Sequence, residues 1–555
     1  MLAAVPNEEA ARDLAGRYWE GLLELDPLIG TYIGDDRYDD RLPDPTDAGI
    51  ARRKAFSEGA LAEMGALDLA SLDSELRTTL DILEAAARRE LDDIAFRMDR
   101  LGAVSHLFGP SNLLASLASM QMAKTPEQLD KYARRLEALG PYLDAVRVVA
   151  LEGAGVGQTA PGLVVDRTIG QLERLLSMDP ERSPGMTPVE NSSQEDKDRV
   201  ARVLREVVWP AHARYLDALR EYRPHARETI GLSELPDGEA MYAAQVRGHT
   251  TLDLDPRAVH ETGREQLTLI LEERQEIARK LGHPEVKSAL DEYTASGKNT
   301  AASREEMLRL VTQQVERSWE AAPRFFGRLP KANCEVKPVE EFREDDMPGA
   351  YYHPGTADGA RPGVYYVNTG HLESRPLHQT ATTSYHEANP GHHFQVTLEM
   401  EFADRMPLRR FGGFLVGDSF TEGWGLYSER LADEMGLYLD EHERIGMLEA
   451  QAYRAGRLIV DTGIHALGWD RERAVQQMQE TGASRVDSEI EVDRYITMPG
   501  QALAYMIGKI QIDAWRKTAS ERDGSTFDLR GFHDRLLALG SLPLFSLERE
   551  LQSSA

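Results

Sequence analysis

Most of the chain carries hydrophobic residues at spacings of three and four, which is the period of an amphipathic helix. The residues between them are largely Ala, Glu and Arg, which favour helices. One such stripe consists of Leu267, Ile270, Leu271, Ile277 and Leu281. The pattern predicts helices over residues 8–27, 71–98, 126–150, 196–222, 255–281 and 302–327.

The pattern changes near residue 330. The stretches NCEVKPVEEF, GAYYHPG and GVYYVNTG are rich in Val and Tyr and bounded by Gly or Pro, which predicts short strands. Helical periodicity returns at residue 377 and continues to the end. We therefore expect a mainly α-helical protein with a small β-sheet, and a change in organisation near residue 330. The Pro- and Ser-rich stretch 177–195 predicts a solvent-exposed connector.

Composition narrows the possible chemistry. The 555 residues include 64 Lys and Arg against 93 Asp and Glu, so the net charge is −29. This charge disfavours nucleic acids and anionic membranes as partners. The single cysteine, Cys334, excludes an internal disulfide and any multi-cysteine metal cluster. A metal site in this chain must therefore use His and carboxylate ligands.

The sequence offers no recognisable export or membrane signal. The N-terminal MLAAVPNEEA lacks the basic start and apolar core of a signal peptide, which predicts a cytoplasmic protein. The longest uncharged run, residues 101–123, contains Ser, His, Asn, Gln, Gly and Pro and is too polar for a membrane span. We expect no membrane partner, and the oligomeric state stays open.

The helix predicted from residue 377 contains HEANPGHH, residues 386–393. In many zinc hydrolases two histidines one helical turn apart bind the metal, and a Glu beside the first activates a water molecule. The usual second histidine is four residues after the first. In this sequence the second histidine is His392 or His393, six or seven residues after His386.

An unbroken helix cannot make this site. At ~100° per residue, a side chain six positions on points roughly 240° away, and one seven positions on lies about 10.5 Å along the axis. Pro390 and Gly391 interrupt helical geometry. We expect the intervening residues to loop out so that His392 takes the usual second position. His393 is the alternative ligand or a supporting group.

A third ligand is expected from Glu422 in FTEGWGLYSE. The glycines on either side of Trp424 allow another helix to approach closely, and Glu429, seven residues on, can orient a histidine ligand. Three protein ligands leave a fourth position open for water. The prediction is one Zn²⁺ per chain, held by His386, His392 or His393, and Glu422.

Further segments resemble those of a known family. They are DPLIGTYIGDDRYDDRLPD (26–44), AYYHPGTADGARPGVYYVNT (350–369), YHEANPGHHFQ (385–395), EGWGLYSERLADEMG (422–436), RLIVDTGIHALGW (457–469) and MPGQALAYMIGK (498–509). On these segments the chain resembles DUF885, a bacterial family placed among gluzincin-like zinc metallopeptidases with an HExxPGHH motif. The resemblance implies a two-lobed peptidase fold with its active site in a cleft. Residues 1–330 would form a mainly helical lobe and residues 331–555 the catalytic lobe of one peptidase unit. Met506 departs from the Lys expected in many relatives.

We therefore expect a zinc metallopeptidase that cleaves short peptides, with Glu387 as general base. Because related peptidases place Tyr and His on downstream helices, Tyr505 or His465 is expected to stabilise the oxyanion. Arg494 and Tyr495 are expected to bind a substrate carboxylate. In each case a structural role, as an interface aromatic, a buried histidine or a salt bridge, is about as consistent with the sequence.

Tyr366 and Asn368 lie in GVYYVNTG, which we expect to form an edge strand that pairs with an extended peptide. Two other functions fit the same residues: a zinc amidohydrolase acting on a non-peptide amide, and a non-catalytic, metal-stabilised peptide-binding protein. Glu387 argues against the second, since a structural metal site needs ligands but no base. The sequence does not decide between a carboxypeptidase and an oligopeptidase.

Overall fold

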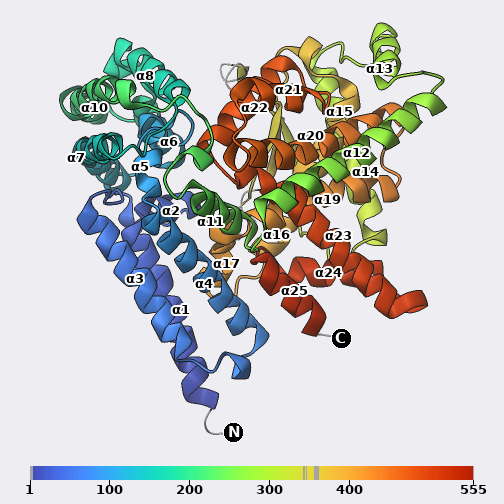
Figure 1. Cartoon of the computed structure of the whole chain (residues 1–555), viewed down its shortest axis with the longest axis horizontal. Coiled ribbons are helices and arrows are strands. Elements are labelled where there is room, and N and C mark those ends of the chain that lie inside the picture. Colours follow the sequence, from blue (N-terminus) through green and yellow to red (C-terminus); the bar gives the residue numbers. More distant parts are fainter. Residues whose placement is uncertain (1–3, 342–343, 345–346, 356–361, 554–555) are drawn as a thin grey trace. The chain divides into compact units, whose positions relative to one another are not determined.

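The computed structural model describes residues 4–341, 344, 347–355 and 362–553 (Figure 1). The chain divides into two compact units. The first comprises Met1–Ala244, Ile464–Arg471 and Asp493–Pro499, and the second comprises Gln245–Gly463, Glu472–Val492 and Gly500–Ala555. Residues 356–361, within one of the family-like segments, lie outside the described residues.

The first unit is built from helices whose apolar stripes face one another. In α7, Thr125 and Gln128 form a capping box at the start, and Leu129, Leu136 and Leu143 are buried along one face. The helices of residues 1–250 are α1 (Ala4–Leu25), α2 (Pro27–Ile33), α3 (Asp47–Gly65), α4 (Ser74–Ala95), α5 (Met98–Gly102), α6 (Leu113–Met120), α7 (Pro126–Gly155), α8 (Gly162–Ser177), α9 (Gln194–Val203), α10 (Trp209–Tyr222) and α11 (Gly238–Thr250).

The helices that follow supply most of the second unit and return twice to the first. They are α12 (Pro256–Lys280), α13 (Val286–Ala295), α14 (Arg304–Ala321), α15 (Leu377–Glu387), α16 (His392–Met400), α17 (Pro407–Phe411), α18 (Gly413–Val416), α19 (Asp418–Glu434), α20 (Glu441–His465), α21 (Arg471–Gln479), α22 (Arg485–Thr497), α23 (Ala504–Asp523), α24 (Leu529–Leu539) and α25 (Leu544–Ser553). The expected mainly helical character is confirmed. No helix among the described residues has the length and apolar character required to cross a membrane.

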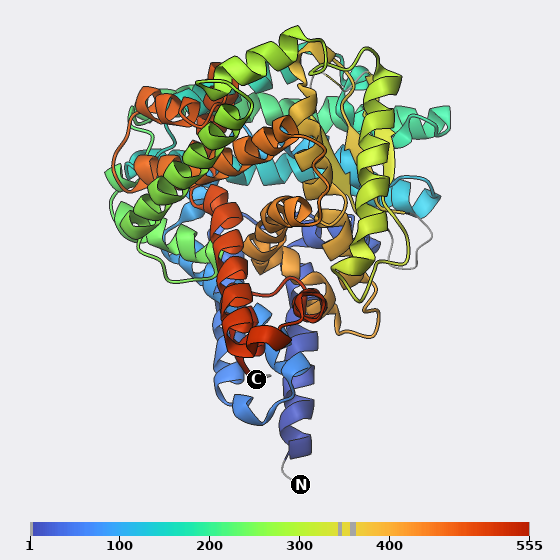
Figure 2. The same ribbon diagram turned by 90° about the vertical axis from the view of Figure 1, so that its right-hand side faces the viewer.

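In the described part of the chain, one small sheet contains β1 (Glu335–Pro338), β2 (Ala350–His353) and β3 (Val364–Val367). The strand order is β1-β3-β2, with β1 parallel and β2 antiparallel to β3. The sheet lies beside α14 (Figure 2). Tyr365 and Val367 of β3 pack with Met307 and Val311 of α14. The expected strands are confirmed, but the expectation that GVYYVNTG forms an edge is wrong. It forms the central strand, because its apolar side chains are largely buried.

The boundary between the two units falls after Ala244, whereas the sequence led us to expect a change near residue 330. Residues 245–330 belong to the second unit because their helices pack on its other helices. Gly263 of α12 approaches α20 so closely that an added Cβ would lie 2.7 Å from the Cβ of Leu458. In α14, Gln314 accepts a hydrogen bond from Ser384 of α15 at 2.8 Å.

The stretch 177–195 joins α8 to α9 and contains some local structure. It contains the short 3₁₀ segments Pro180–Arg182 and Pro184–Val189, and Val189 is fully buried. The buried Tyr132 hydroxyl donates a hydrogen bond to the carbonyl of Gly185 at 2.8 Å. Most of the stretch is exposed, as expected of a connector, and this hydrogen bond and the burial of Val189 attach its middle part to the first unit.

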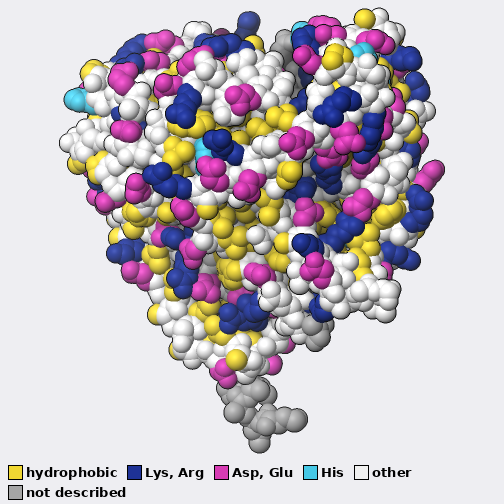
Figure 3. Space-filling model, turned by 45° about the vertical axis from the view of Figure 1, so that its right-hand side comes forward, with side chains coloured by type: hydrophobic (Ala, Val, Ile, Leu, Met, Phe, Trp, Pro, Cys, Tyr) yellow, Lys and Arg dark blue, Asp and Glu magenta, His cyan; other side chains and the backbone are white. Residues whose placement is uncertain are grey.

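Basic and acidic side chains are interspersed over the face of the molecule shown in Figure 3. The surplus of acidic residues therefore does not gather into a single patch on that face. Mixed surface charge of this kind supports solubility and identifies no particular ligand.

Candidate metal centre

The HEANPGHH segment forms two helices joined by a short break. Helix α15 ends at Glu387 and α16 begins at His392. The carbonyl oxygens of Tyr385 and His386 occupy the space that a Cβ on Gly391 would need, so only glycine fits there. The buried indole of Trp424 donates a hydrogen bond to the carbonyl of Pro390 at 2.9 Å and holds the break against α19. The expected interruption of the helix is confirmed.

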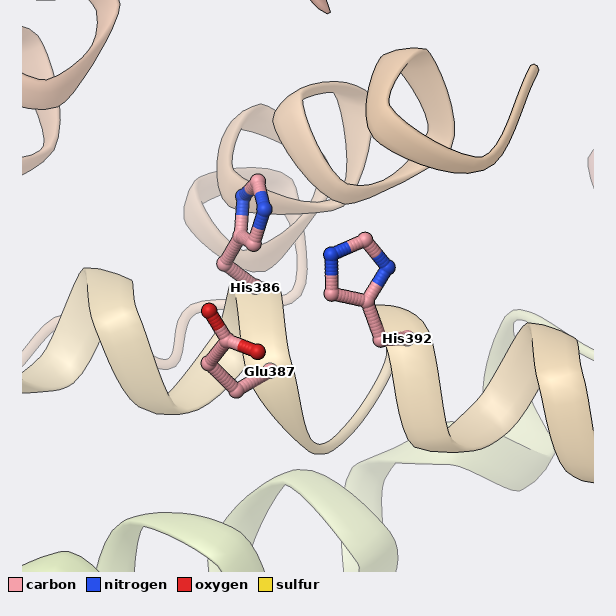
Figure 4. A group of neighbouring side chains, drawn as sticks. All are labelled: His386, Glu387 and His392. Carbon is pink, nitrogen blue, oxygen red and sulfur yellow. The ribbon is translucent and has the colours of Figure 1, made fainter. Parts of the chain in front are cut away.

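The break brings His386 and His392 together. Figure 4 shows their imidazoles on the same side of the break, with the Glu387 carboxylate beside them. One nitrogen of each histidine and one oxygen of Glu387 lie within 4.8 Å of one another. Glu422 of α19 completes the group, because its Oε2 lies 3.6 Å from Nε2 of His386 and 3.5 Å from Nε2 of His392.

These separations suit a tetrahedral metal ion. Two metal–ligand bonds of about 2.1 Å at a tetrahedral angle place their donor atoms about 3.4 Å apart. The Nε2 atoms of His386 and His392 both lie close to that distance from Oε2 of Glu422. Two imidazoles and one carboxylate are also a ligand set that zinc commonly takes when a fourth position stays open. The residues present therefore fit a catalytic type of zinc site.

His386 is oriented from its other side by Glu429. Its Nδ1 lies 2.8 Å from Oε1 of Glu429, a carboxylate that is 1% exposed and accepts a second hydrogen bond from Gln451 at 2.8 Å. The expected supporting role of Glu429 agrees with this geometry. Burial lowers the pKa of His386, but the carboxylates of Glu422 and Glu429 outweigh it and raise this pKa to about 9.

The carboxylates give the centre a strongly anionic character. Burial alone would raise the pKa of Glu422, but hydrogen bonds with His386 and His392 hold it well below its usual value. Glu387 adds a carboxyl group beside both imidazoles, and Glu429 adds another beside that of His386. Such a set attracts a cation, and an approaching divalent ion would displace a proton from His386.

Glu387 is held by the sheet. Its Oε2 accepts a hydrogen bond from the backbone N–H of Tyr352 in β2 at 3.1 Å. This contact leaves Oε1 as the oxygen that can take a proton from a neighbouring group. A carboxylate fixed beside two imidazoles has the placement that a general base requires.

The structure separates the two adjacent histidines. His393 is 1% exposed, with Nε2 3.0 Å from the carbonyl of Ala332 and Nδ1 3.2 Å from the hydroxyl of Tyr352. Burial lowers its pKa to about 4. His392 therefore lies beside His386, and His393 points into a different environment, so the alternative in which His393 is the ligand is not supported by the geometry.

The glycines around Trp424 make this packing possible. A Cβ on Gly425 would lie 2.7 Å from Cε1 of His386, and one on Gly423 would lie 2.5 Å from the carbonyl carbon of Gly508 in α23. Gly423 thus allows the expected close approach of another helix, α23, and Gly425 leaves room for the His386 imidazole. Glu422 is positioned by a helix that tolerates no side chain at either point.

The two residues expected to stabilise an oxyanion differ. His465 is fully buried, with Nδ1 accepting from the N–H of Leu232 at 3.2 Å and Nε2 donating to the carbonyl of Tyr495 at 2.9 Å. Burial lowers its pKa to about 3. Since backbone groups use both ring nitrogens, His465 has a structural role instead. Tyr505 is half-buried, with the guanidinium carbon of Arg457 4.4 Å from its ring centroid, and its catalytic role stays a prediction.

Of the four expected substrate-binding residues, two belong to the other unit and two lie in or directly after β3. Arg494 and Tyr495 belong to the first compact unit, whereas the cluster belongs to the second, and their role stays a prediction. Asn368 is fully buried and donates to the carbonyl of Glu344 at 2.8 Å, so it supports a loop instead of facing a ligand. Tyr366 stacks on Tyr351 with ring centroids 5.0 Å apart.

Two residues of the site had not been predicted. Tyr352 was visible only as part of a predicted strand, and its contribution is a backbone N–H that no side-chain motif reveals. Gln451 lies on α20, 22 positions after Glu429, and donates to both Glu429 and the carbonyl of Leu426. No sequence motif pairs a glutamine at this distance with Glu429.

The fold and the cluster together define a mainly helical protein with a candidate metal centre of two histidines and glutamates. The chain belongs to the family described as bacterial protein of unknown function (DUF885), whose model matches residues 27–551. The family expected from the sequence is thereby confirmed. No curated protein matches this chain.

Two solved structures share the fold. One, from Colwellia psychrerythraea, has a TM-score of 0.90 at 24% identity, with 99% of each chain covered. The other, from Shewanella oneidensis, has a TM-score of 0.78 at 18% identity, with 97% of this chain and 99% of that chain covered. Both are described as a "putative lipoprotein", the second "of unknown function". These descriptions contradict the cytoplasmic location predicted from the sequence, which is withdrawn.

Proposed function

We propose that this protein is a zinc-dependent peptidase that hydrolyses bonds in short peptides. The observation that carries the proposal is the placement of His386 and His392 around one oxygen of Glu422, at 3.6 and 3.5 Å, with Glu387 beside them. A purely structural zinc site is normally closed by four protein ligands. Three candidate ligands accompanied by a fixed carboxylate fit a hydrolytic site better.

The chain's own residues suggest how the reaction would run. A bound zinc ion would polarise the substrate carbonyl and make a water molecule more acidic. Glu387 would accept a proton from the attacking water at Oε1, because Oε2 already accepts the Tyr352 N–H. Glu387 would then pass that proton to the departing amine as the peptide bond breaks, so that Glu387 returns to its charged form.

The sheet favours a peptide over another amide as substrate. In the described residues β2 pairs on one side only, with β3, and the Tyr352 N–H on its other side points to Glu387. An extended peptide that pairs with this edge would pass beside the proposed base. Edge strand β2 thus takes the role that the sequence had assigned to the segment containing Tyr366 and Asn368. The HExxPGHH motif supports the finer proposal of a two-lobed gluzincin-type fold with a cleft.

The test combines metal analysis with digestion of a peptide library. We expect about one zinc per chain in the wild type, with loss of zinc in His386→Ala and Glu422→Ala. Glu387→Gln should keep the zinc and lose cleavage of the library. A wild type that binds zinc and cleaves nothing would favour a metal-stabilised binding protein. Equal cleavage by wild type and Glu387→Gln would exclude Glu387 as the base, and the cleavage positions would separate carboxypeptidase from oligopeptidase activity.

A further inference from the structure

Tyr352 contacts the candidate centre at one end and a buried histidine at the other. Its backbone N–H donates to Oε2 of Glu387 at 3.1 Å. Its hydroxyl lies 3.2 Å from Nδ1 of His393 and 3.4 Å from Oγ1 of Thr397, both on α16. One residue of the edge strand therefore links the proposed base to the helix that also carries His392.

The hydrogen-bond directions follow from the partners of His393. The carbonyl oxygen of Ala332 can only accept, so Nε2 of His393 carries the proton and donates to it at 3.0 Å. In the neutral ring Nδ1 is then an acceptor, and the hydroxyls of Tyr352 at 3.2 Å and Thr397 at 3.3 Å both lie within hydrogen-bonding distance of it. His393 is thereby fixed at both nitrogens, and its ring meets that of Tyr352 edge to face with centroids 5.5 Å apart.

The start of β3 closes around this pair of rings. A Cβ on Gly363 would lie 2.7 Å from Nδ1 of His393 and still closer to the hydroxyl of Tyr352. The backbone at Gly363 therefore packs directly against the hydrogen bond between Tyr352 and His393. This packing leaves the Tyr352 side chain little freedom to shift away from α16.

We propose that His393 is a positioning residue that anchors Tyr352, so that the Tyr352 N–H holds the Glu387 carboxylate beside the metal centre and fixes edge strand β2. This inference rests on the proposed function for its consequence, but the anchor itself is a property of the chain. The anchoring role assigns the second histidine of the HH pair, His393, a structural function that does not involve binding metal. Small misplacements of a reacting group slow catalysis strongly, so loss of the anchor should lower kcat.

The first test does not depend on activity. Hydrogen exchange measured by mass spectrometry should show the amide of Tyr352 exchanging about tenfold faster in His393→Ala and in Tyr352→Phe than in the wild type. His393→Gln supplies an NH₂ group that can donate to the Ala332 carbonyl and an oxygen that can accept from Tyr352, and should restore slow exchange. His371→Ala, which removes an exposed imidazole, is the control for deleting a histidine. Unchanged exchange in both His393→Ala and Tyr352→Phe would overturn the proposal.

The second test separates anchoring from ligation. His393→Ala should retain the wild-type zinc content, whereas His392→Ala should lose it. On a cleaved peptide, His393→Ala and Tyr352→Phe should each lower kcat about tenfold with a smaller change in KM. Loss of zinc from folded His393→Ala would make His393 a ligand and refute the anchoring role. If the wild type binds no zinc and cleaves no peptide, the proposed function fails, and the exchange measurement still decides whether the anchor exists.

Discussion

Glu429 provides a sharp test of how the candidate centre is built. Its carboxylate accepts from Nδ1 of His386 at 2.8 Å and from Nε2 of Gln451 at 2.8 Å. In Glu429→Gln the new amide can keep its oxygen toward His386, but its NH₂ group then faces the NH₂ group of Gln451. Gln451 cannot turn over without cost, because its Nε2 also donates to the carbonyl of Leu426 at 3.0 Å.

The substitution therefore removes the charge behind His386 and leaves two donors facing each other in a buried place. Loss of a carboxylate that supports a metal-binding histidine typically lowers metal affinity about 10- to 100-fold. This corresponds to about 1.4–2.7 kcal/mol of binding free energy. We expect Glu429→Gln to fall toward the upper end of this range, because the conflict with Gln451 adds to the lost charge.

The assay is a zinc titration against a competing chelator, with circular dichroism to confirm that each variant is folded. Glu434→Gln is the matched control, because Glu434 lies on the same helix and pairs with Arg516 at the surface. The control should bind zinc as the wild type does. A zinc affinity for Glu429→Gln within twofold of the wild type would refute the orienting role of Glu429.

Two further predictions concern packing and pH. Gly425→Ala places a Cβ 2.7 Å from Cε1 of His386, so zinc affinity should fall at least about tenfold. The control Gly59→Ala, on α3 with open space around it, should leave zinc affinity unchanged. Equal zinc affinities of the two variants would show that a side chain at Gly425 does not displace His386. His533 is fully buried, accepts from the Tyr427 hydroxyl at 2.8 Å and donates to the Phe325 carbonyl at 3.0 Å. Burial lowers its pKa to about 4. The unfolded chain therefore binds a proton at this residue near pH 6.5, whereas the folded chain binds it only near pH 4. Stability should therefore decrease as the pH falls through this window, by about 2 kcal/mol at pH 5 from this residue alone. Urea unfolding at pH 7.5 and 5.0 should show a smaller pH effect in His533→Gln than in wild type, and an identical effect would exclude His533 as a source.

Much of the fold could be predicted because the hydrophobic pattern of a helix depends only on residues that are close in sequence. The stripe at Leu129, Leu136 and Leu143 specifies a helix whatever the rest of the chain does. The metal cluster was accessible for a related reason, since His386, Pro390 and His392 are close in sequence and the geometry of a helix limits how they can meet. Predicting Glu422 as a ligand required only one additional helix to be placed beside the histidines.

The errors arose where long-range packing decides the outcome. Whether the strand containing Tyr366 lies at the centre or the edge of a sheet depends on partners that its own sequence does not specify. His465 and a catalytic histidine look alike in sequence, because the backbone groups that occupy its nitrogens come from residues 232 and 495. The Tyr352 contact with Glu387 was invisible for the simplest reason, since every residue other than proline has a backbone N–H.

The order of the chain does not follow the division into units. Arg167 pairs with Asp493, and the N–H of Leu232 donates to His465, so the first unit acquires some of its internal contacts only from residues that are synthesised far later. Domains that are continuous in sequence can fold one after another as they leave the ribosome. In this protein the unit formed by the N-terminal 244 residues is complete only when residues 464–471 and 493–499 have been synthesised. Completion of the first unit thus requires synthesis as far as residue 499, and a C-terminal truncation that extends into residues 464–499 would harm both units.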